Sequence, residues 1–176
     1  MTYDPAADPE FAHPYVDIDE WREADALGVR HRYVHGGFTG TQTRFSFYLP
    51  PAEDYQGRFF QHVTPVPESE NLAQQSTELD AANKVAMAFD AGAAFVETNG
   101  GGGGMAQSPD PSLAAYRANA ASAERFRTVA SAMYGEHRAY GYLYGGSGGG
   151  FRTIGSAENT AGVWDGFVPY VIGSPM

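Results

Sequence analysis

A serine between glycines is the residue of this sequence best suited to nucleophilic chemistry. Ser147 stands in the segment GGSGG of residues 145–149 and so matches the pattern G-x-S-x-G. In this pattern the serine lies on a sharp turn from a strand into a helix, and small residues two positions before and after it let the two elements approach closely. Residues 140–144 are predicted to form the strand and residues 151–156 to begin the helix. Ser147 is therefore predicted to be a catalytic nucleophile; the alternative is a glycine-rich turn with an incidental serine.

Such a serine works with backbone amides that bind the oxygen anion of a tetrahedral intermediate. The first amide is that of Gly148, at the N-terminus of the predicted helix, where amides have no partner within the helix. The second is expected in the loop after the preceding strand, near Val63 or Thr64. We therefore predict an oxyanion hole formed by Gly148 and Thr64.

Glycine-rich loops also bind phosphate groups, but the residues of this chain do not fit that use. A P-loop needs Gly-Lys-Ser or Gly-Lys-Thr, and the single lysine, Lys84, is far from every glycine run. A dinucleotide fingerprint G-x-G-x-x-G fails in each register near Ser147, because its last glycine falls on Phe151 or Thr153 or its second glycine falls on the serine itself. The sequence has no cysteine, which excludes disulfides, thiolate catalysis and cysteine-bound zinc. No cofactor and no metal site is predicted.

Alternating strands and helices are expected to position the serine. The pattern predicts an α/β fold with a mostly parallel sheet and helices on both faces. Strand 140–144 is expected to be central, between strands 58–63 and 93–98. The other predicted elements are a hairpin over residues 30–49 with its turn at Gly36–Gly40, helices over residues 81–91 and 111–134, a glycine run at residues 100–104 and a last strand over residues 167–172.

From Tyr116 onward the chain resembles the tannase and feruloyl esterase family of α/β-hydrolases. The similarity rests on AYRAN at residues 115–119, YLYGGSGG at 142–149 and VWDGFV at 163–168, and upstream on GRFFQ at 57–61. It covers roughly residues 44–175 and implies hydrolysis of carboxylic esters through an acyl-enzyme. The chain departs from the family at Gly146, where many members carry a cysteine. It also has HVTP at residues 62–65, where many members have a glycine run.

The resemblance also implies a triad whose acid and histidine follow the serine along the chain. All five histidines precede Ser147, so the acid and the base are expected beyond residue 176 or in another chain. His62 is the best candidate base within the chain; its alternative role is to close a strand or line the oxyanion loop. Asp165 and Glu158 follow the serine and are expected to be cap or surface groups.

Composition restricts the partners. The formal charge is −10 with 11 basic residues, so no basic stripe is present and nucleic acid is not an expected partner. No apolar run approaches the ~20 residues that span a bilayer, so no membrane association is expected. The first ten residues are acidic, unlike a signal peptide, so a cytoplasmic location is expected; the alternative is a secreted protein whose leader has been removed. The expected ligand is a small-molecule ester.

The predicted organisation is an acidic N-terminal arm, residues 1–29, followed by one α/β-hydrolase core, residues 30–176. The sheet is expected to stop after the strand that follows the nucleophile helix. This leaves strand 167–172 as an apolar edge suited to a homo-oligomer or to a partner chain that completes the sheet. Two functions remain open, a serine esterase of the α/β-hydrolase fold and a catalytically inactive hydrolase-like fragment or binding module. The chain alone is expected to be inactive.

Overall fold

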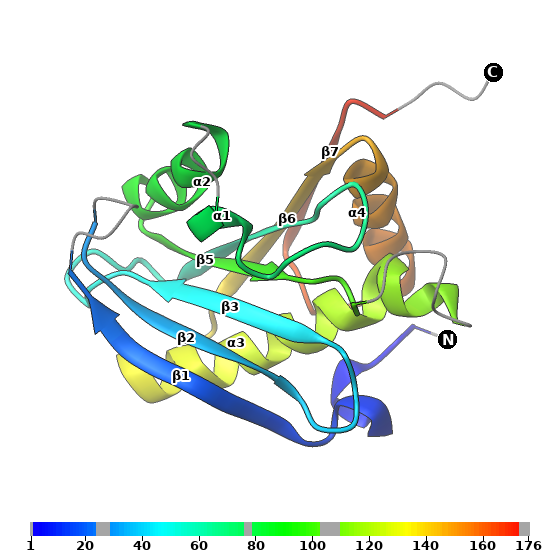
Figure 1. Ribbon diagram of the computed structural model, residues 1–176, viewed down its shortest axis with the longest axis horizontal. Helices are drawn as coiled ribbons and strands as arrows, with labels where there is room; N and C mark the ends of the chain where they lie inside the picture. Colours follow the sequence, from blue (N-terminus) through cyan, green and yellow to red (C-terminus); the bar gives the residue numbers. More distant parts are fainter. Residues whose placement is uncertain (1, 24–28, 76–78, 103–109, 173–176) are drawn as a thin grey trace.

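The computed structural model describes residues 2–23, 29–75, 79–102 and 110–172. Its centre is a seven-stranded sheet in the order β1-β2-β3-β5-β4-β6-β7 (Figure 1). The strands are β1 (Pro14–Arg22), β2 (His31–Phe38), β3 (Arg44–Leu49), β4 (Arg58–His62), β5 (Ala93–Thr98), β6 (Tyr140–Gly146) and β7 (Gly166–Tyr170). Strands β5, β4, β6 and β7 are parallel, whereas the pairs β1–β2, β2–β3 and β3–β5 are antiparallel. The predicted mostly parallel α/β sheet is confirmed.

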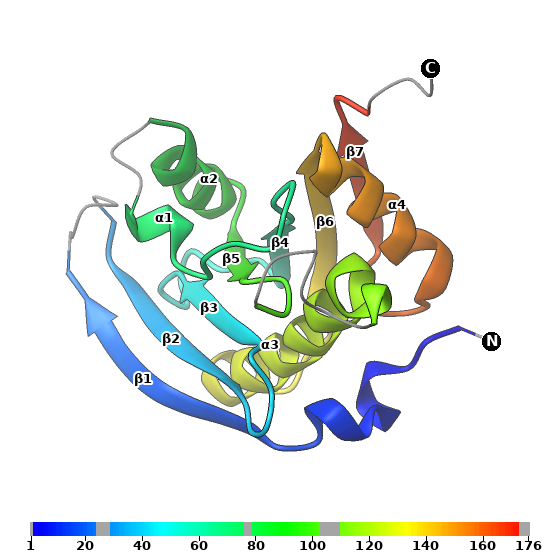
Figure 2. The same ribbon diagram turned by 45° about the vertical axis from the view of Figure 1, so that its right-hand side comes forward.

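Helices cover both faces of this sheet, as predicted. The short helix α1 (Leu72–Gln75) and the helix α2 (Leu79–Asp90) lie on one face. A π-helical turn, Leu113–Arg117, runs into α3 (Ala118–Tyr134), and α3 and α4 (Gly148–Asn159) lie on the other face (Figure 2). No helix in the described ranges is long and apolar enough to cross a bilayer.

The predicted neighbours of β6 were wrong in one respect. β6 lies between β4 and β7, and β5 lies on the far side of β4. The chain leaves β4 through α1 and α2 on one face and returns from β5 through α3 on the opposite face. Because crossovers between parallel strands are right-handed, a change of face reverses the direction in which the chain advances. β5 and β6 therefore enter on opposite sides of β4.

The acidic segment predicted as a solvated arm contains a strand. Residues 14–22 form β1 and pair along the full length of β2, although most of their side chains are exposed. The predicted turn at Gly36–Gly40 also needs correction, because Gly36 and Gly37 lie inside β2. A Cβ on Gly36 would lie 2.0 Å from the Tyr15 carbonyl oxygen of β1, so this glycine permits a close approach of two strands rather than a turn.

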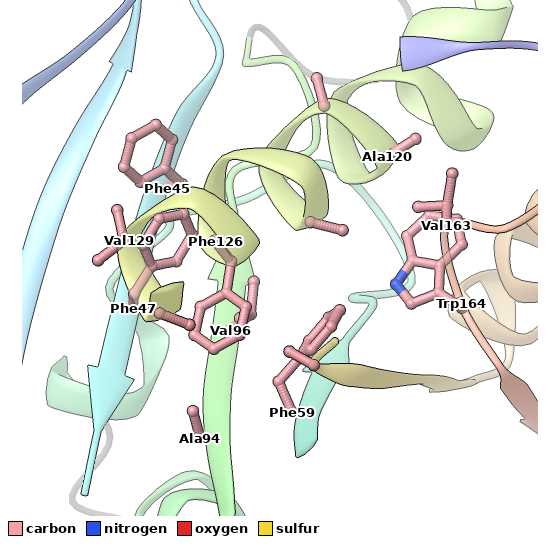
Figure 3. Packing of buried hydrophobic residues seen from close by; sticks show 14 of the residues in the cluster. Phe45, Phe47, Phe59, Ala94, Val96, Ala120, Phe126, Val129, Val163 and Trp164 are labelled. Carbon is pink, nitrogen blue, oxygen red and sulfur yellow. The ribbon is translucent and has the colours of Figure 1, made fainter. Parts of the chain in front are cut away.

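The core between the sheet and α3 is built from aromatic rings (Figure 3). Phe45 and Phe47 stack with their centroids 4.4 Å apart, and Phe126 of α3 contacts Phe47 and Phe59 at 5.5 and 4.7 Å. These rings are fully buried. They pack α3 against β3 and β4 and so fix the position of this helix on the sheet.

Candidate active site

Ser147 is the single residue between β6 and α4. Its backbone has φ 54° and ψ −122°, a conformation that side-chain-bearing residues rarely adopt and that the surrounding structure must enforce. The enforcing contacts lie on both sides: the Ser147 amide donates to the Tyr170 carbonyl at 3.1 Å, and the Ser147 carbonyl accepts from the Phe151 amide at 3.2 Å. The residue itself is exposed. This is the strand-turn-helix geometry that the sequence pattern predicts.

The glycines around Ser147 are required by backbone packing against the loop after β4. A Cβ on Gly149 would lie 2.2 Å from the Val63 carbonyl oxygen, and a Cβ on Gly148 would lie 2.3 Å from the Pro65 carbonyl oxygen. Such distances leave no room for a methyl group. The turn at Ser147 and the loop of residues 63–66 therefore form one unit, as an oxyanion hole assembled from both segments requires.

The amides of this loop differ in their availability. Val63 donates its amide to the Tyr144 carbonyl at 2.9 Å and so extends the pairing of β4 with β6. Within the described residues the Thr64 amide makes no hydrogen bond, while the Thr64 carbonyl accepts from Arg152 at 2.9 Å. Of the two predicted donors, Thr64 is the one not already used by the sheet. The Gly148 amide lies in the first turn of α4, where helices leave amides unpaired.

His62, the candidate base, lies at the end of β4 beside Tyr144, with the two ring centroids 5.2 Å apart. Burial, together with the charge of Lys84, lowers the pKa of His62 to about 3. A histidine with such a pKa stays neutral near pH 7 and accepts a proton poorly. Across the described ranges no hydrogen bond joins the Ser147 hydroxyl to a histidine. The described residues also include no hydrogen-bond partner that would orient His62 for a role as base.

The other titratable groups considered from the sequence lie in separate contacts. His35 interacts with Asp17 and Glu70 on the β1 side of the sheet. His137 hydrogen-bonds to Tyr55 near the start of β6. Asp165 accepts from the Gly141 amide at 2.9 Å and pairs with Arg138, which matches the expected role of a cap or surface group; Glu158 is exposed on α4.

Two buried ionisable groups near the carboxyl ends of the strands were not identified from the sequence. Glu97 of β5 is 5% exposed, and burial raises its pKa to about 8, although Tyr48 donates to it at 2.6 Å. Arg152 of α4 is 6% exposed and contacts the loop after β4. Each residue interrupts an otherwise uncharged stretch, residues 93–98 and 143–157. A charge within such a stretch was the available signal.

Comparison with known proteins supports the fold. No protein-family model matches the chain, and no curated protein matches its sequence. Among solved structures, tannin acyl hydrolase from Aspergillus niger is similar with a TM-score of 0.56 and 20% identity. Lipase A from Candida antarctica has a TM-score of 0.53 with 16% identity, and acetyl xylan esterase from Paenibacillus sp. R4 has 0.53 with 16%.

These matches extend over nearly all of this chain but over only part of each solved structure. They cover 88%, 92% and 94% of this chain, and 31%, 44% and 54% of the respective solved chains. At such low identity the similarity establishes the fold and leaves the activity to be argued from the site. The fold is that of the α/β-hydrolases.

Proposed function

We propose that this chain of α/β-hydrolase fold carries the nucleophile of a carboxylic ester hydrolase, with Ser147 as the attacking group. The observation that carries the proposal is the conformation of Ser147, an exposed serine at φ 54° between a strand and a helix. A strained backbone at an exposed nucleophilic side chain is typical of a catalytic residue. The similar solved structures include an acyl hydrolase, a lipase and an esterase, which agrees with the same reaction class.

In the proposed reaction the Ser147 oxygen attacks the ester carbonyl carbon and loses its proton to a base. The carbonyl oxygen becomes an anion that the amides of Gly148 and Thr64 stabilise. Collapse of this tetrahedral intermediate breaks the bond to the alcohol, which leaves with a proton, and an acyl-enzyme remains. Water then attacks the acyl group and releases the acid. The substrate is proposed only as a small-molecule carboxylic ester, because the similar enzymes act on different esters.

The base and its acidic partner are proposed to come from polypeptide outside these 176 residues, either along the same chain or in another one. His62 does not fit the role, since burial lowers its pKa to about 3. The solved structures that resemble the chain are about two to three times as long as the part it matches, since that part is 31% to 54% of their length. Resemblance to the tannase and feruloyl esterase family is part of the same proposal.

Labelling with a fluorophosphonate tests the proposal. The reagent is applied to the 176-residue chain, to its Ser147→Ala variant and to a version extended past Met176, and the modified serine is located by peptide mass spectrometry. We expect an adduct at Ser147 that forms at least one hundred times faster in the extended version, together with turnover of p-nitrophenyl acetate that is lost on Ser147→Ala. An extended protein that is modified elsewhere, or not at all, would disprove the assignment.

One observation favours a second function, a catalytically inactive hydrolase-like fragment or binding module. Throughout the described residues, the Ser147 hydroxyl has no histidine within hydrogen-bond distance. The same experiment separates the two functions, because an inactive module gives no Ser147 adduct even when extended. Ser147-dependent turnover by the 176-residue chain at ordinary enzyme rates would contradict the inactive module and the proposal of an external base, and it would make His62 the candidate base.

A further inference from the structure

Arg152 is a buried cation that contacts the loop carrying one donor of the proposed oxyanion hole. It lies in α4, just over one turn after Ser147, and is 6% exposed. Its Nε donates to the Ala114 carbonyl at 2.6 Å, and its NH1 donates to the Thr64 carbonyl at 2.9 Å. The guanidinium therefore joins α4 to the turn before α3 and to the residue whose amide is the proposed oxyanion donor.

The charge of Arg152 is not neutralised within the described part of the chain. Its third nitrogen, NH2, is buried and has no hydrogen-bond partner, and no carboxylate forms an ion pair with the side chain. Burial lowers the pKa of Arg152 to about 10, and no titratable neighbour contributes to that change. The side chain therefore remains positively charged at neutral pH. Burying a charge without a counter-ion costs folding free energy. If stability were the only requirement at this position, an apolar or ion-paired residue would be favoured.

The loop after β5 leaves space for the unpaired nitrogen. A Cβ on Gly100 would lie 2.4 Å from NH2 of Arg152, and Gly100 has φ +67°, which favours glycine. The Gly100 amide is turned away and donates to the Thr98 hydroxyl at 3.1 Å. The loops after β4 and β5 and the turn before α3 thus meet around one guanidinium.

We propose that Arg152 is a positioning residue of the oxyanion hole, which holds Thr64 in place and supplies an unneutralised positive charge beneath the developing anion. The inference rests on the proposed function of Ser147. Such a charge, held in place by hydrogen bonds to two carbonyls, favours the intermediate over the neutral ester and needs no reorganisation during the reaction. The negative charge of the intermediate is the counter-ion that Arg152 lacks among the described residues.

Arg127 provides a matched control at the opposite end of β6. It lies in α3 and also joins two carbonyls, donating to Ala139 at 3.2 Å and to Val163 at 2.6 Å. Unlike Arg152, it has carboxylate partners, among them Glu124 at 2.6 Å. Its replacement removes a similar set of hydrogen bonds but leaves the loop after β4 untouched.

The first measurement is hydrogen exchange of the Val63 amide in the 176-residue chain, because this amide adjoins Thr64 and is held by Tyr144. After correction for global stability, Arg152→Met should raise its exchange rate at least about tenfold, with Arg152→Lys in between and Arg127→Met at the wild-type value. An unchanged rate in Arg152→Met would overturn the positioning role. This readout does not require a reactive serine.

The second measurement is the rate of Ser147 phosphonylation against pH, made in the form of the protein that gives the adduct. Arg152→Met should react at least about tenfold more slowly than wild type and Arg127→Met at the wild-type rate. Arg152→Lys should recover much of the rate near pH 6 and lose it as pH rises, because a buried lysine releases its proton where arginine does not. Equal rates for Arg152→Met and wild type would overturn the electrostatic role. If no protein reacts, the proposed function fails, and hydrogen exchange still decides the positioning role.

Discussion

One face of the sheet has two halves that differ in what covers them. Under α1 and α2 the sheet carries a connected polar network: the Tyr33 hydroxyl bonds to Ser46 and Asn71, and Tyr48 donates to Glu97. The half formed by β6 and β7 is apolar and open. It presents a groove of about 470 Å³ whose lining includes Phe60, Met87, Tyr142, Val168 and Tyr170.

The difference shows that a side chain on this face is buried when a helix covers it, whether that side chain is polar or apolar. Glu97 is 5% exposed because α1 supplies the Ala73 amide as a partner and because Tyr48 donates from β3. Val168 is 57% exposed because no described element packs over β7 on this face. An apolar half-face of this kind is typical of a surface that binds another polypeptide. A homo-oligomer or a partner chain on β7 therefore stays our proposal.

The largest expected effect comes from protonation of Glu97 in the covered half. Its pKa is raised from 4.5 to about 8 on folding, so the folded protein holds a proton that the unfolded chain has released. The free energy of unfolding should therefore fall as pH rises through this window. Below pH 6.5 the lowered pKa of His62 acts in the opposite sense, since stability there rises with pH. Among the described groups with a shifted pKa, Glu97 is the one that titrates between pH 6.5 and 8, and we expect a loss of about 2 kcal/mol.

Urea unfolding at pH 6.5 and pH 8 measures this loss. Glu97→Gln keeps an acceptor for Tyr48 and Ala73 but cannot ionise, so its stability should be nearly constant over the same range. A wild-type protein that is equally stable at both pH values would show that Glu97 does not stay protonated.

The next effect is removal of one hydroxyl from the polar network. Tyr48→Phe leaves Glu97 without its shortest hydrogen bond and removes one of the two acceptors of Gln74 Nε2, so we expect a loss of about 1 to 1.5 kcal/mol. Tyr140→Phe is the matched control on the open side, because Tyr140 is 51% exposed and can hydrogen-bond to water instead. It should change stability by less than about 0.5 kcal/mol. Equal losses in the two variants would remove the distinction between the halves.

The smallest effect concerns association through the open half. Val168→Lys places a charge on the exposed apolar face of β7, so self-association of the chain should weaken about threefold to fivefold, measured by sedimentation. Val16→Lys is the control on β1, where the valine is 37% exposed. It should leave association unchanged. A chain that is monomeric at every concentration would argue against the proposed oligomer.

The sequence predicted the elements whose signal is local. The hairpin of β2 and β3, the buried β5 and the turn at Ser147 follow from alternation and from glycine placement over a few residues. β1 was missed because its residues are mostly exposed and give no alternation, and it is specified by pairing with β2. The position of β5 was missed for a similar reason, since strand order depends on crossovers that no local pattern encodes.

In the candidate site, too, features with a local sequence signal could be predicted and features that depend on distant contacts could not. Ser147 and the loop near Thr64 could be located, because the first has a motif and the second is defined by the fold that the motif implies. The role proposed for Arg152 could not be predicted from the sequence, because it depends on contacts with the carbonyls of Ala114 and Thr64, which are 38 and 88 residues away in the chain. Nor could the weak basicity of His62 be foreseen, since its cause is burial beneath packed elements.

The insertion of β5 between β3 and β4 has a consequence for synthesis on the ribosome. β3 and β4 leave the ribosome first, yet neither pairs with the other, and β4 has both its neighbours, β5 and β6, later in the chain. β4 stays without a hydrogen-bonded neighbour until β5 emerges, and its second edge stays unpaired until residues 140–146 follow. During that interval Phe59 and Phe60 lack the strands that pair with β4 in the folded sheet, so we expect the yield of folded protein to be sensitive to translation speed and chaperone access at this segment.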